Sequence, residues 1–319
     1  MNYIFPEKFW WGSATSGPQS EGTVEDDGKS KNIWDYWFKI APERFFDGVG
    51  PKDTSTFYKN YKQDIQLLKQ TGHNSFRTSI QWSRLIPDGV GEVNQKAVAF
   101  YNNVIDELIK NDIEIIINLY HFDMPLCMQQ KGGWENKEVV DAYAEYAQKC
   151  FALFGDRVKY WTTFNEPIVP VEGGYLYDFH YPNVIDGKRG AQVAYHTALA
   201  SAKAIERYRN LKLNGQIGIV LNLTPSYPRS EQNPEDVKAA HIADLCFNKS
   251  FLDPAIKGEY PKDLVEFLKQ NDALPQYEQK DIDTIKNNTI DFLGVNYYRP
   301  RRIKAKESEV IYKDVFMPD

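Results

Sequence analysis

Several absences narrow the class of protein before any motif is considered. The chain of 319 residues has only three cysteines, Cys127, Cys150 and Cys246, which are odd in number and far apart. This usage is typical of thiols kept in a reducing compartment. No apolar run approaches the roughly 18 residues that cross a bilayer. The first six residues also have neither the basic start nor the apolar core of a secretion signal. The sequence therefore predicts a cytoplasmic protein with no membrane partner.

An excess of basic residues is also missing. The net charge of −6 argues against nucleic acid or an anionic membrane surface as the main partner. The five histidines show no H-x-x-x-H spacing and there is no close cysteine pair, so no metal site is predicted. A hydrophobic content of 42% and a charged content of 26% indicate a soluble globular protein.

What is present is an alternation of short strand-like runs with longer amphipathic stretches. This pattern is typical of an α/β fold with a parallel sheet, either closed into a barrel or open and doubly wound. The predicted strands are Phe9–Ser16, Asn74–Ile80, Ile113–Tyr120, Lys159–Phe164, Gln216–Leu223 and Asp291–Tyr298. The predicted helices are Thr54–Thr71, Asn94–Lys110, Lys137–Phe154, Gly190–Asn210 and Pro234–Asn248.

Two features favour the barrel over the doubly wound sheet. After the first strand, Gly12–Gly17 has serine where a dinucleotide-binding turn needs its second glycine. Polar residues also gather where several different strands end, as in barrel active sites. These residues are Gln19, His121, Asp123, Asn165, Glu166, Asn296 and Tyr298.

The number of strands conflicts with a complete barrel. A closed β/α barrel has eight strands, and at the spacing found here it needs on the order of 430 residues. Only six strands are predicted, and an unclosed barrel exposes two strand edges. The sequence therefore predicts one domain, residues 1–319, that is an incomplete β/α barrel: a truncated chain, a fragment, or one piece of a split protein.

The most informative local pattern is Asn165-Glu166-Pro167. It follows a run rich in β-branched and aromatic residues that is typical of a buried strand. Pro167 cannot donate a ladder hydrogen bond and is expected to hold Glu166 extended, so that the strand stops there. A carboxylate fixed at a strand mouth beside an amide is suited to proton transfer. The plain alternative is an ordinary strand exit with Glu166 facing water.

Five ordered blocks resemble family 1 glycoside hydrolases. The blocks are Phe5–Thr15 with Gln19–Gly22, Phe76–Arg84, His121–Pro125, Thr163–Pro167 and Asn296–Tyr298. The resemblance implies an eight-stranded β/α barrel and a retaining β-glycosidase that needs no metal or cofactor. Such an enzyme uses one carboxylic acid to protonate the leaving oxygen and a second carboxylate to attack the anomeric carbon.

The resemblance also implies roles for individual residues. Glu166 would be the general acid and then the base, and Asn165 would bind the sugar 2-OH. Gln19 and His121 would bind other hydroxyls of the ring. Three further residues, Arg77, Asn296 and Tyr298, would line the same site, with Arg77 and Tyr298 holding the nucleophile. Adjacent residues point oppositely in a regular strand, so Asn165 and Glu166 both reach the site only if the chain twists or bulges at Pro167.

Each assignment has a structural alternative. Arg77 could form a buried ion pair, His121 could be a core histidine and Gln19 a loop residue that binds backbone. Asn296 and Tyr298 could be ordinary strand residues. We expect Trp134 to serve packing rather than sugar stacking, and Asp123 to be a structural partner rather than a catalytic acid.

Two departures from the family pattern bear on activity. The family's nucleophile lies in a Thr-Glu-Asn-Gly block, and this sequence has no such block. Glu259 and Glu266 lie on the wrong elements to replace it. The chain by itself is therefore expected to be inactive or to need a complementing fragment. Phe122 also stands where the family usually has tryptophan after the histidine.

The substrate is predicted from location and from one block. A cytoplasmic glycosidase suits sugars that are phosphorylated during uptake, and Trp10–Gln19 resembles the bacterial 6-phospho-β-glucosidases. We therefore expect the intact enzyme to hydrolyse 6-phospho-β-glucosides, a small-molecule partner that includes phosphorylated disaccharides. A basic cluster just past the sixth strand, Arg299, Arg301, Arg302 and Lys304, is expected to be a solvated edge. An unphosphorylated β-glucosidase or β-galactosidase, and a non-catalytic sugar-binding or assembly protein made from a shortened barrel, remain open alternatives.

Overall fold

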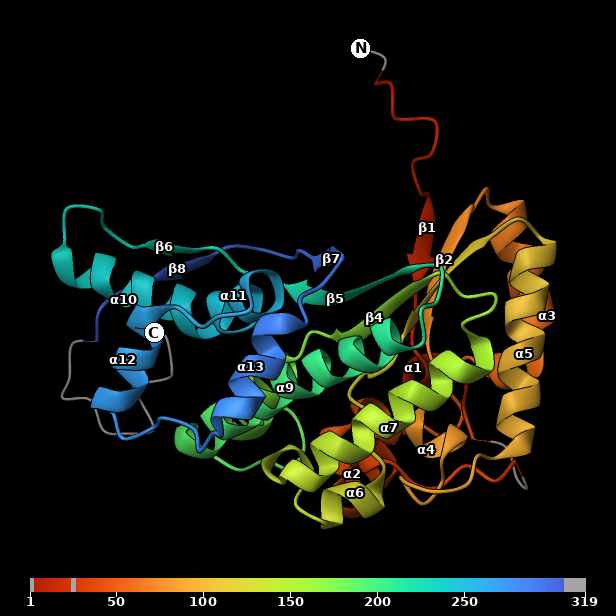
Figure 1. Ribbon diagram of the computed structural model, residues 1–319, viewed down its shortest axis with the longest axis horizontal. Coiled ribbons are helices and arrows are strands. Elements are labelled where there is room, and N and C mark those ends of the chain that lie inside the picture. Colours follow the sequence, from red (N-terminus) through yellow and green to blue (C-terminus); the bar gives the residue numbers. More distant parts are fainter. Residues whose placement is uncertain (1–2, 24–26, 307–319) are drawn as a thin grey trace. The chain divides into compact units, whose positions relative to one another are not determined.

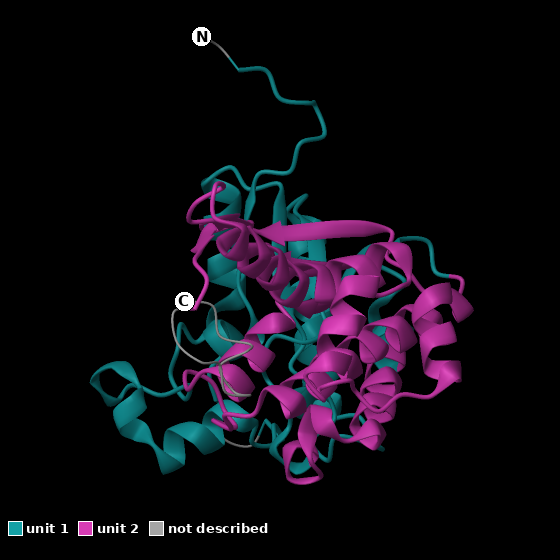
Figure 2. Cartoon of the chain, turned by 90° about the vertical axis from the view of Figure 1, so that its left-hand side faces the viewer, with its two compact units in different colours: residues 1–127, 149–162, 213–216 teal, residues 128–148, 163–212, 217–319 magenta. Residues whose placement is uncertain are grey.

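The computed structural model describes residues 3–23 and 27–306 (Figure 1). The chain divides into two compact units, coloured separately in Figure 2. The first comprises Met1–Cys127, Lys149–Thr162 and Leu213–Gln216, and the second Met128–Gln148, Thr163–Lys212 and Ile217–Asp319. The domain predicted over residues 1–319 also includes 1–2, 24–26 and 307–319, which lie outside the described residues. That it is a single domain stays a prediction.

Six strands form one sheet, and all six were predicted. Their order is β1-β2-β3-β4-β5-β7, so each strand is next to its neighbour in sequence. The pairs β1–β2, β2–β3, β3–β4 and β5–β7 run parallel. An order with no reversal point differs from that of a doubly wound sheet and is the order of a barrel. The strands are β1 (Gly12–Ala14), β2 (Ser75–Ser79), β3 (Glu114–Asn118), β4 (Tyr160–Asn165), β5 (Gln216–Asn222) and β7 (Phe292–Asn296).

The long helices of the first unit show why the helical predictions are confirmed. Helix α3 (Phe57–Gln70) packs against α5 (Gln95–Lys110). Asn94 caps α5, because its side-chain oxygen accepts a hydrogen bond from the Lys96 amide at 3.1 Å. The apolar residues that recur at helical spacing in this segment are buried at Tyr101, Val104, Ile105 and Leu108 and half-buried at Val98.

The second unit is built around α9 (Gly187–Asn210), which α13 (Gln279–Asn287) contacts. The Asp186 side chain accepts hydrogen bonds from the amides of Lys188 and Arg189 and so caps α9. The predicted helix 137–154 is α7 (Lys137–Phe154), which runs from the second unit into the first. Trp134 is 4% exposed, and its ring lies 5.4 Å from that of Phe164. Its predicted packing role is therefore confirmed.

Short elements are what the sequence analysis did not predict. A second, two-stranded parallel sheet joins β6 (Ser226–Pro228) to β8 (Arg301–Ile303). Strands of three residues carry no periodic signal, and prolines border both. The other elements of the first unit are α1 (Gly17–Ser20), α2 (Ile33–Ile40), η1 (Pro42–Arg44), η2 (Phe46–Gly48) and α4 (Trp82–Leu85), while α6 (Leu126–Gln130) runs on into the second unit. Those of the second unit are η3 (Gly133–Glu135), α8 (Ile168–Val171), η4 (Glu172–Leu176), α10 (Pro234–Asp244), η5 (Leu245–Lys249), α11 (Ser250–Lys257) and α12 (Lys262–Gln270).

In the part of the chain that the structure describes, every helix is too short or too polar to pass through a bilayer.

Candidate active site

The backbone of Glu166 is the unusual feature of the second unit. Glu166 follows the last residue of β4 and has φ 48°, in the left-handed region, rather than the extended conformation that the following proline predicts. Its amide donates to the carbonyl of Val220 at 2.7 Å, and its carbonyl accepts from the amide of Val169 at 2.9 Å. These two bonds stabilise a conformation that costs about 1–2 kcal/mol for a residue with a side chain. The prediction that β4 ends here is confirmed, but the extended conformation is wrong.

The left-handed turn brings the side chains of Asn165 and Glu166 to the same partner, Asn296. In a regular strand Asn165 and Glu166 would point to opposite faces. Here the Asn296 amide donates to Glu166 Oε1 at 2.5 Å and to Asn165 Oδ1 at 3.2 Å. The irregularity expected at Pro167 is therefore found at Glu166 itself, and backbone strain of this kind is concentrated at functional sites.

Tyr298 completes the group around the carboxylate. Its hydroxyl lies 3.3 Å from Glu166 Oε1, the same oxygen that Asn296 contacts. Asn296 ends β7 and Tyr298 follows two residues later, and both side chains contact Glu166. The Glu166 residue is 7% exposed and Tyr298 is 72% exposed. Both donors are neutral, so neither forms an ion pair with this carboxyl group.

Arg301 corrects one expectation about the basic cluster. Its guanidinium donates to Glu172 Oε1 at 2.6 Å and lies 4.3 Å from the ring centroid of Phe247. The solvated edge predicted for this residue is therefore wrong. Arg302 is exposed and donates to the backbone carbonyl of Arg229 at 3.0 Å. A carboxylate and an aromatic face hold Arg301 in place.

His121 is the best-supported candidate of the first unit. Its residue is 5% exposed, and its Nδ1 is buried with no hydrogen-bond partner among residues 3–23 and 27–306. Burial, together with the positive charge of Arg77 on β2, lowers the pKa of His121 to about 3. The imidazole is therefore neutral at physiological pH and keeps one buried nitrogen unpaired, which differs from the satisfied core histidine of the alternative interpretation.

Gln19 lies on a short helix of the first unit. Gln19 lies on α1 and is exposed, and its Oε1 accepts a hydrogen bond from the Ser16 hydroxyl at 2.8 Å. It is thus a helix residue that binds a side chain, not a loop residue that binds backbone.

Asp123 is placed beside His121. Its Oδ1 accepts a hydrogen bond from the His121 backbone amide at 3.0 Å, as expected of a structural partner. Burial raises the pKa of Asp123 to about 7, and its second oxygen has no partner within the described chain.

The structure brings four of the seven predicted site residues into contact. Asn165, Glu166, Asn296 and Tyr298 meet in the second unit, whereas Gln19, Arg77 and His121 belong to the first unit. No cluster of three or more potential metal ligands occurs within residues 3–23 and 27–306.

Glu21 and Arg84, which have no role in the sequence-based predictions, form a buried ion pair at 2.7 Å. The available signal was a pair of opposite charges inside two of the five blocks.

Comparisons with known proteins identify the family. The model of the glycosyl hydrolase family 1 matches residues 1–315. The chain is 63% identical over 317 residues to the 6-phospho-beta-glucosidase GmuD of Bacillus subtilis, covering 99% of this chain and 68% of that protein. It is 40% identical to a 6-phospho-beta-galactosidase of Clostridium acetobutylicum, covering 96% of this chain and 65% of the relative.

A solved structure also matches the fold. The psychrophilic beta-glucosidase BglU from Micrococcus antarcticus superimposes with a TM-score of 0.89 and 36% sequence identity, over 94% of this chain and 63% of that one. The chain thus spans about two thirds of the length of these relatives. Its six-stranded parallel sheet is part of a β/α-barrel fold.

Proposed function

The chain belongs to glycosyl hydrolase family 1, and we propose that it supplies the acid/base residue and part of the sugar-binding site of a retaining 6-phospho-β-glucosidase. The observation that carries the proposal is the buried Glu166 carboxyl, turned by a left-handed backbone toward two neutral donors, Asn296 and Tyr298. A carboxyl group in such surroundings is suited to giving and taking back one proton.

In the proposed reaction Glu166 acts twice. It first gives its proton to the glycosidic oxygen while the bond from that oxygen to the anomeric carbon breaks and a second carboxylate bonds to the carbon. The ionised Glu166 then takes a proton from water as the water oxygen displaces the second carboxylate. The sugar leaves with its anomeric configuration retained, and Glu166 is again protonated. The second carboxylate of this scheme is not assigned to a residue of this sequence.

The neighbours of Glu166 have supporting roles in the proposal. Asn165 is assigned to the sugar 2-OH, a hydrogen bond that strengthens in the transition state. Its oxygen is fixed by Asn296, which also holds Glu166 Oε1. From the first unit, Gln19 and His121 are assigned to sugar hydroxyls and Arg77 to the nucleophile, roles that rest on the family resemblance and, for His121, on the unpaired buried nitrogen.

The phosphate on the substrate is supported by relatedness. The chain is 63% identical to a protein named as a 6-phospho-beta-glucosidase, against 39% for a Thermotoga neapolitana relative named as a 1,4-beta-D-glucan glucohydrolase. Sugars phosphorylated during uptake occur inside the cell, so we place the reaction in the cytoplasm. Chemically, the proposed partner is a β-linked glucoside with a phosphate on C6.

The test compares two chromogenic substrates, p-nitrophenyl β-D-glucoside with and without a 6-phosphate, on the chain supplied with a complementing fragment that carries the second carboxylate. We expect the phosphorylated compound to have a kcat/KM at least about 100-fold higher, equivalent to about 2.7 kcal/mol of transition-state stabilisation. Binding of each compound to the chain is measured in parallel by calorimetry. The proposal is overturned if neither compound is hydrolysed and neither compound binds.

The role of Glu166 is tested in the same complemented protein with Glu166→Gln, which keeps the shape and removes the proton. We expect kcat to fall by about 10²–10⁴-fold, with a smaller loss for leaving groups that depart without protonation. Glu135→Gln is the matched control, because this carboxylate of the same unit pairs with Arg189 at 2.7 Å and is assigned no chemical role. Equal losses in the two variants would contradict the assignment.

An unphosphorylated β-glucosidase is the second candidate. It is favoured by the similarity to the beta-glucosidase BglU. Equal kcat/KM values for the two substrates would favour it, and the assignment of Glu166 would be unaffected. Binding without hydrolysis in a chain that carries an added second carboxylate would instead favour a non-catalytic sugar-binding protein.

A further inference from the structure

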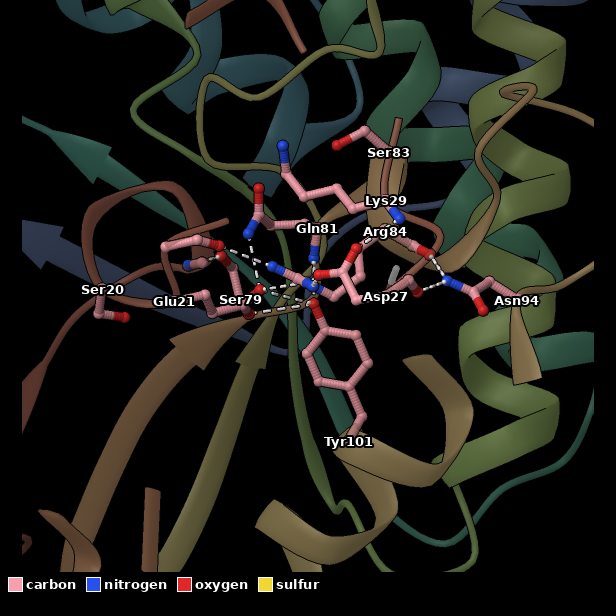
Figure 3. Close-up of polar contacts among 12 residues, drawn as sticks. Ser20, Glu21, Asp27, Lys29, Ser79, Gln81, Ser83, Arg84, Asn94 and Tyr101 are labelled. Atoms are coloured by element: carbon pink, nitrogen blue, oxygen red, sulfur yellow. Dashed lines mark hydrogen bonds and ion pairs between the residues drawn. The ribbon is translucent and has the colours of Figure 1, made fainter. Parts of the chain in front are cut away.

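A buried polar cluster in the first unit is used by none of the roles above. We name it the Glu21 cluster, and it consists of Glu21, Asp27, Gln81, Arg84 and Tyr101. All five residues are at most 5% exposed. Figure 3 shows the side chains of Gln81, Arg84 and Tyr101 meeting at the Glu21 carboxylate.

The Glu21 carboxylate accepts hydrogen bonds on both of its oxygens. Its Oε2 accepts from Gln81 Nε2 at 2.6 Å and from Arg84 Nε at 2.7 Å, and its Oε1 accepts from the Tyr101 hydroxyl at 3.0 Å. Burial and the charge of Glu21 raise the pKa of Tyr101 well above its usual value, so the hydroxyl stays protonated and donates. A buried charge this fully satisfied has one fixed position.

Arg84 ties the cluster to one chain segment. Besides Glu21, its guanidinium donates to the side chain of Asp27 and, at 2.9 Å, to the carbonyl of Gly22. It also lies 4.5 Å from the ring centroid of Tyr58. All of its hydrogen bonds thus go to the segment that follows α1, the helix that carries Gln19.

Helix α1 itself rests on the cluster. The Gly17 amide donates to Ser79 Oγ at 2.8 Å, and the Glu21 amide donates to the Gly17 carbonyl at 2.9 Å. A Cβ at Gly17 would lie 2.3 Å from Gln81 Cγ and 2.9 Å from Glu21 Oε1. The helix therefore approaches the cluster as closely as glycine permits, and Gln19 is two residues from the carboxylate.

A second chain of contacts leads from the cluster toward His121. The Gln81 side-chain oxygen accepts from Asn32 Nδ2 at 3.4 Å, and Asn32 forms a β-bridge with Pro125. The Ile33 amide donates to the Met124 carbonyl at 3.0 Å. The segment that begins with His121 is thus fastened to the same carboxylate through Gln81 and Asn32.

We propose that Glu21 is a positioning residue that sets the places of Gln19 and His121 together, and thereby controls sugar affinity without touching the sugar. The inference rests on the proposed function, which names a glucoside 6-phosphate as the ligand. The connection from Glu21 to the segments of Gln19 and His121 rests on the hydrogen bonds described above. A purely structural ion pair would stabilise the fold and leave the two segments independent of each other.

The first experiment measures local opening by hydrogen exchange in the full chain. Glu21→Gln removes the charge that faces Arg84 and leaves one side of the former carboxylate without an acceptor, so we expect amide exchange to rise about tenfold or more in residues 16–22 and 121–126. Glu172→Gln is the control, since it breaks the buried pair with Arg301 and should leave both segments unchanged. Unchanged exchange in either segment of Glu21→Gln would overturn the proposal, whatever the chain binds.

The second experiment is a double-mutant cycle on binding of methyl β-D-glucoside 6-phosphate. We expect Gln19→Ala and Glu21→Gln each to weaken binding about tenfold, and the double variant to weaken it clearly less than about 100-fold, because the part of the Glu21 effect that acts through Gln19 is already lost. Independent effects would multiply to about 100-fold, and that result would contradict positioning through Gln19. If the wild-type chain binds no glucoside, the proposed function fails and the exchange experiment alone decides on Glu21.

A milder variant keeps both tests open if Glu21→Gln does not fold. Tyr101→Phe removes one donor from Glu21 and retains the ion pair with Arg84. We expect the same pattern at reduced amplitude, with faster exchange in both segments and about threefold weaker binding. The effect of Tyr101→Phe on binding should be smaller when Gln19→Ala is already present. Faster exchange throughout the chain, with no preference for these segments, would indicate a structural role only.

Discussion

Two buried glutamates in the two units show how differently a fold can treat the same side chain. Glu21 is 2% exposed, sits on ordinary helical backbone and receives hydrogen bonds from a glutamine, an arginine and a tyrosine. Glu166 is 7% exposed, sits on strained left-handed backbone and receives hydrogen bonds from two neutral donors on one oxygen. The Glu21 carboxylate accepts hydrogen bonds on both oxygens, whereas the two donors to Glu166 meet at one oxygen, on a strained turn.

The largest expected effect is on stability. Glu21→Gln leaves the buried Arg84 without half of its compensating charge, and we expect a loss of about 3–5 kcal/mol in the free energy of unfolding. Glu166→Gln breaks no ion pair with its two neutral donors, and we expect a change within about 1 kcal/mol. Urea unfolding of both variants at one pH measures the difference. Equal losses would break the comparison, because both carboxylates would then be structural.

A third carboxyl group sharpens the comparison through pH. Asp123 has one unpaired oxygen, and burial raises its pKa to about 7. The folded state therefore holds a proton that the unfolded state releases above about pH 4, so the stabilisation from Asp123 is full below pH 4 and is lost as the pH rises to 7. Relative to wild type, Asp123→Asn should gain about 1.4 kcal/mol per pH unit across that window.

Urea unfolding of wild type and Asp123→Asn at several pH values checks this slope. His121, whose pKa is lowered to about 3, gives the opposite slope between its unfolded pKa and that value. Both proteins contain His121, so its contribution cancels in the difference. A difference that does not change between pH 4 and 7 would mean that Asp123 is ionised in the folded chain.

The repeating part of the fold was predictable because it depends on periodicity. The strand at Ile115 and Ile117 and the helix face from Tyr101 to Leu108 are set by burial of apolar side chains, which sequence patterns report directly. The paired strands β6 and β8 were not predictable, since three-residue strands are stabilised by pairing with a distant segment rather than by a local pattern.

The grouping of four candidate site residues was predictable, but their geometry was not. Asn165, Glu166, Asn296 and Tyr298 were identified from motifs, and contacts between them are found. The left-handed conformation of Glu166 was not, because the following proline favours an extended residue locally and the bond to Val220 comes from another strand. The Glu21 cluster was missed for a similar reason: its five members come from distant chain positions, and their burial follows only from the tertiary fold.

Hydroxyl removal gives a smaller test of the same comparison. Tyr101→Phe removes the hydroxyl that donates to Glu21 and that accepts from the Gln81 backbone amide at 2.9 Å. We therefore expect a loss of about 1–3 kcal/mol in the free energy of unfolding. Tyr298→Phe removes a hydroxyl from a residue that is 72% exposed and should change the free energy of unfolding by less than about 0.5 kcal/mol. Thermal unfolding of both variants distinguishes them, and a larger loss at Tyr298 would show that the Glu166 group is also a stabilising cluster.

The smallest expected effect concerns the backbone of Glu166. Its φ of 48° is strained for any residue with a Cβ, so Glu166→Gly should be about 1 kcal/mol more stable than Glu166→Ala, although both remove the carboxylate. The matched control is the exposed Glu145 in α7, where glycine should be about 1 kcal/mol less stable than alanine. Urea unfolding of the four variants measures both signs. The same sign at both positions would mean that Glu166 carries no strain, and the contrast with Glu21 would then rest on hydrogen bonding alone.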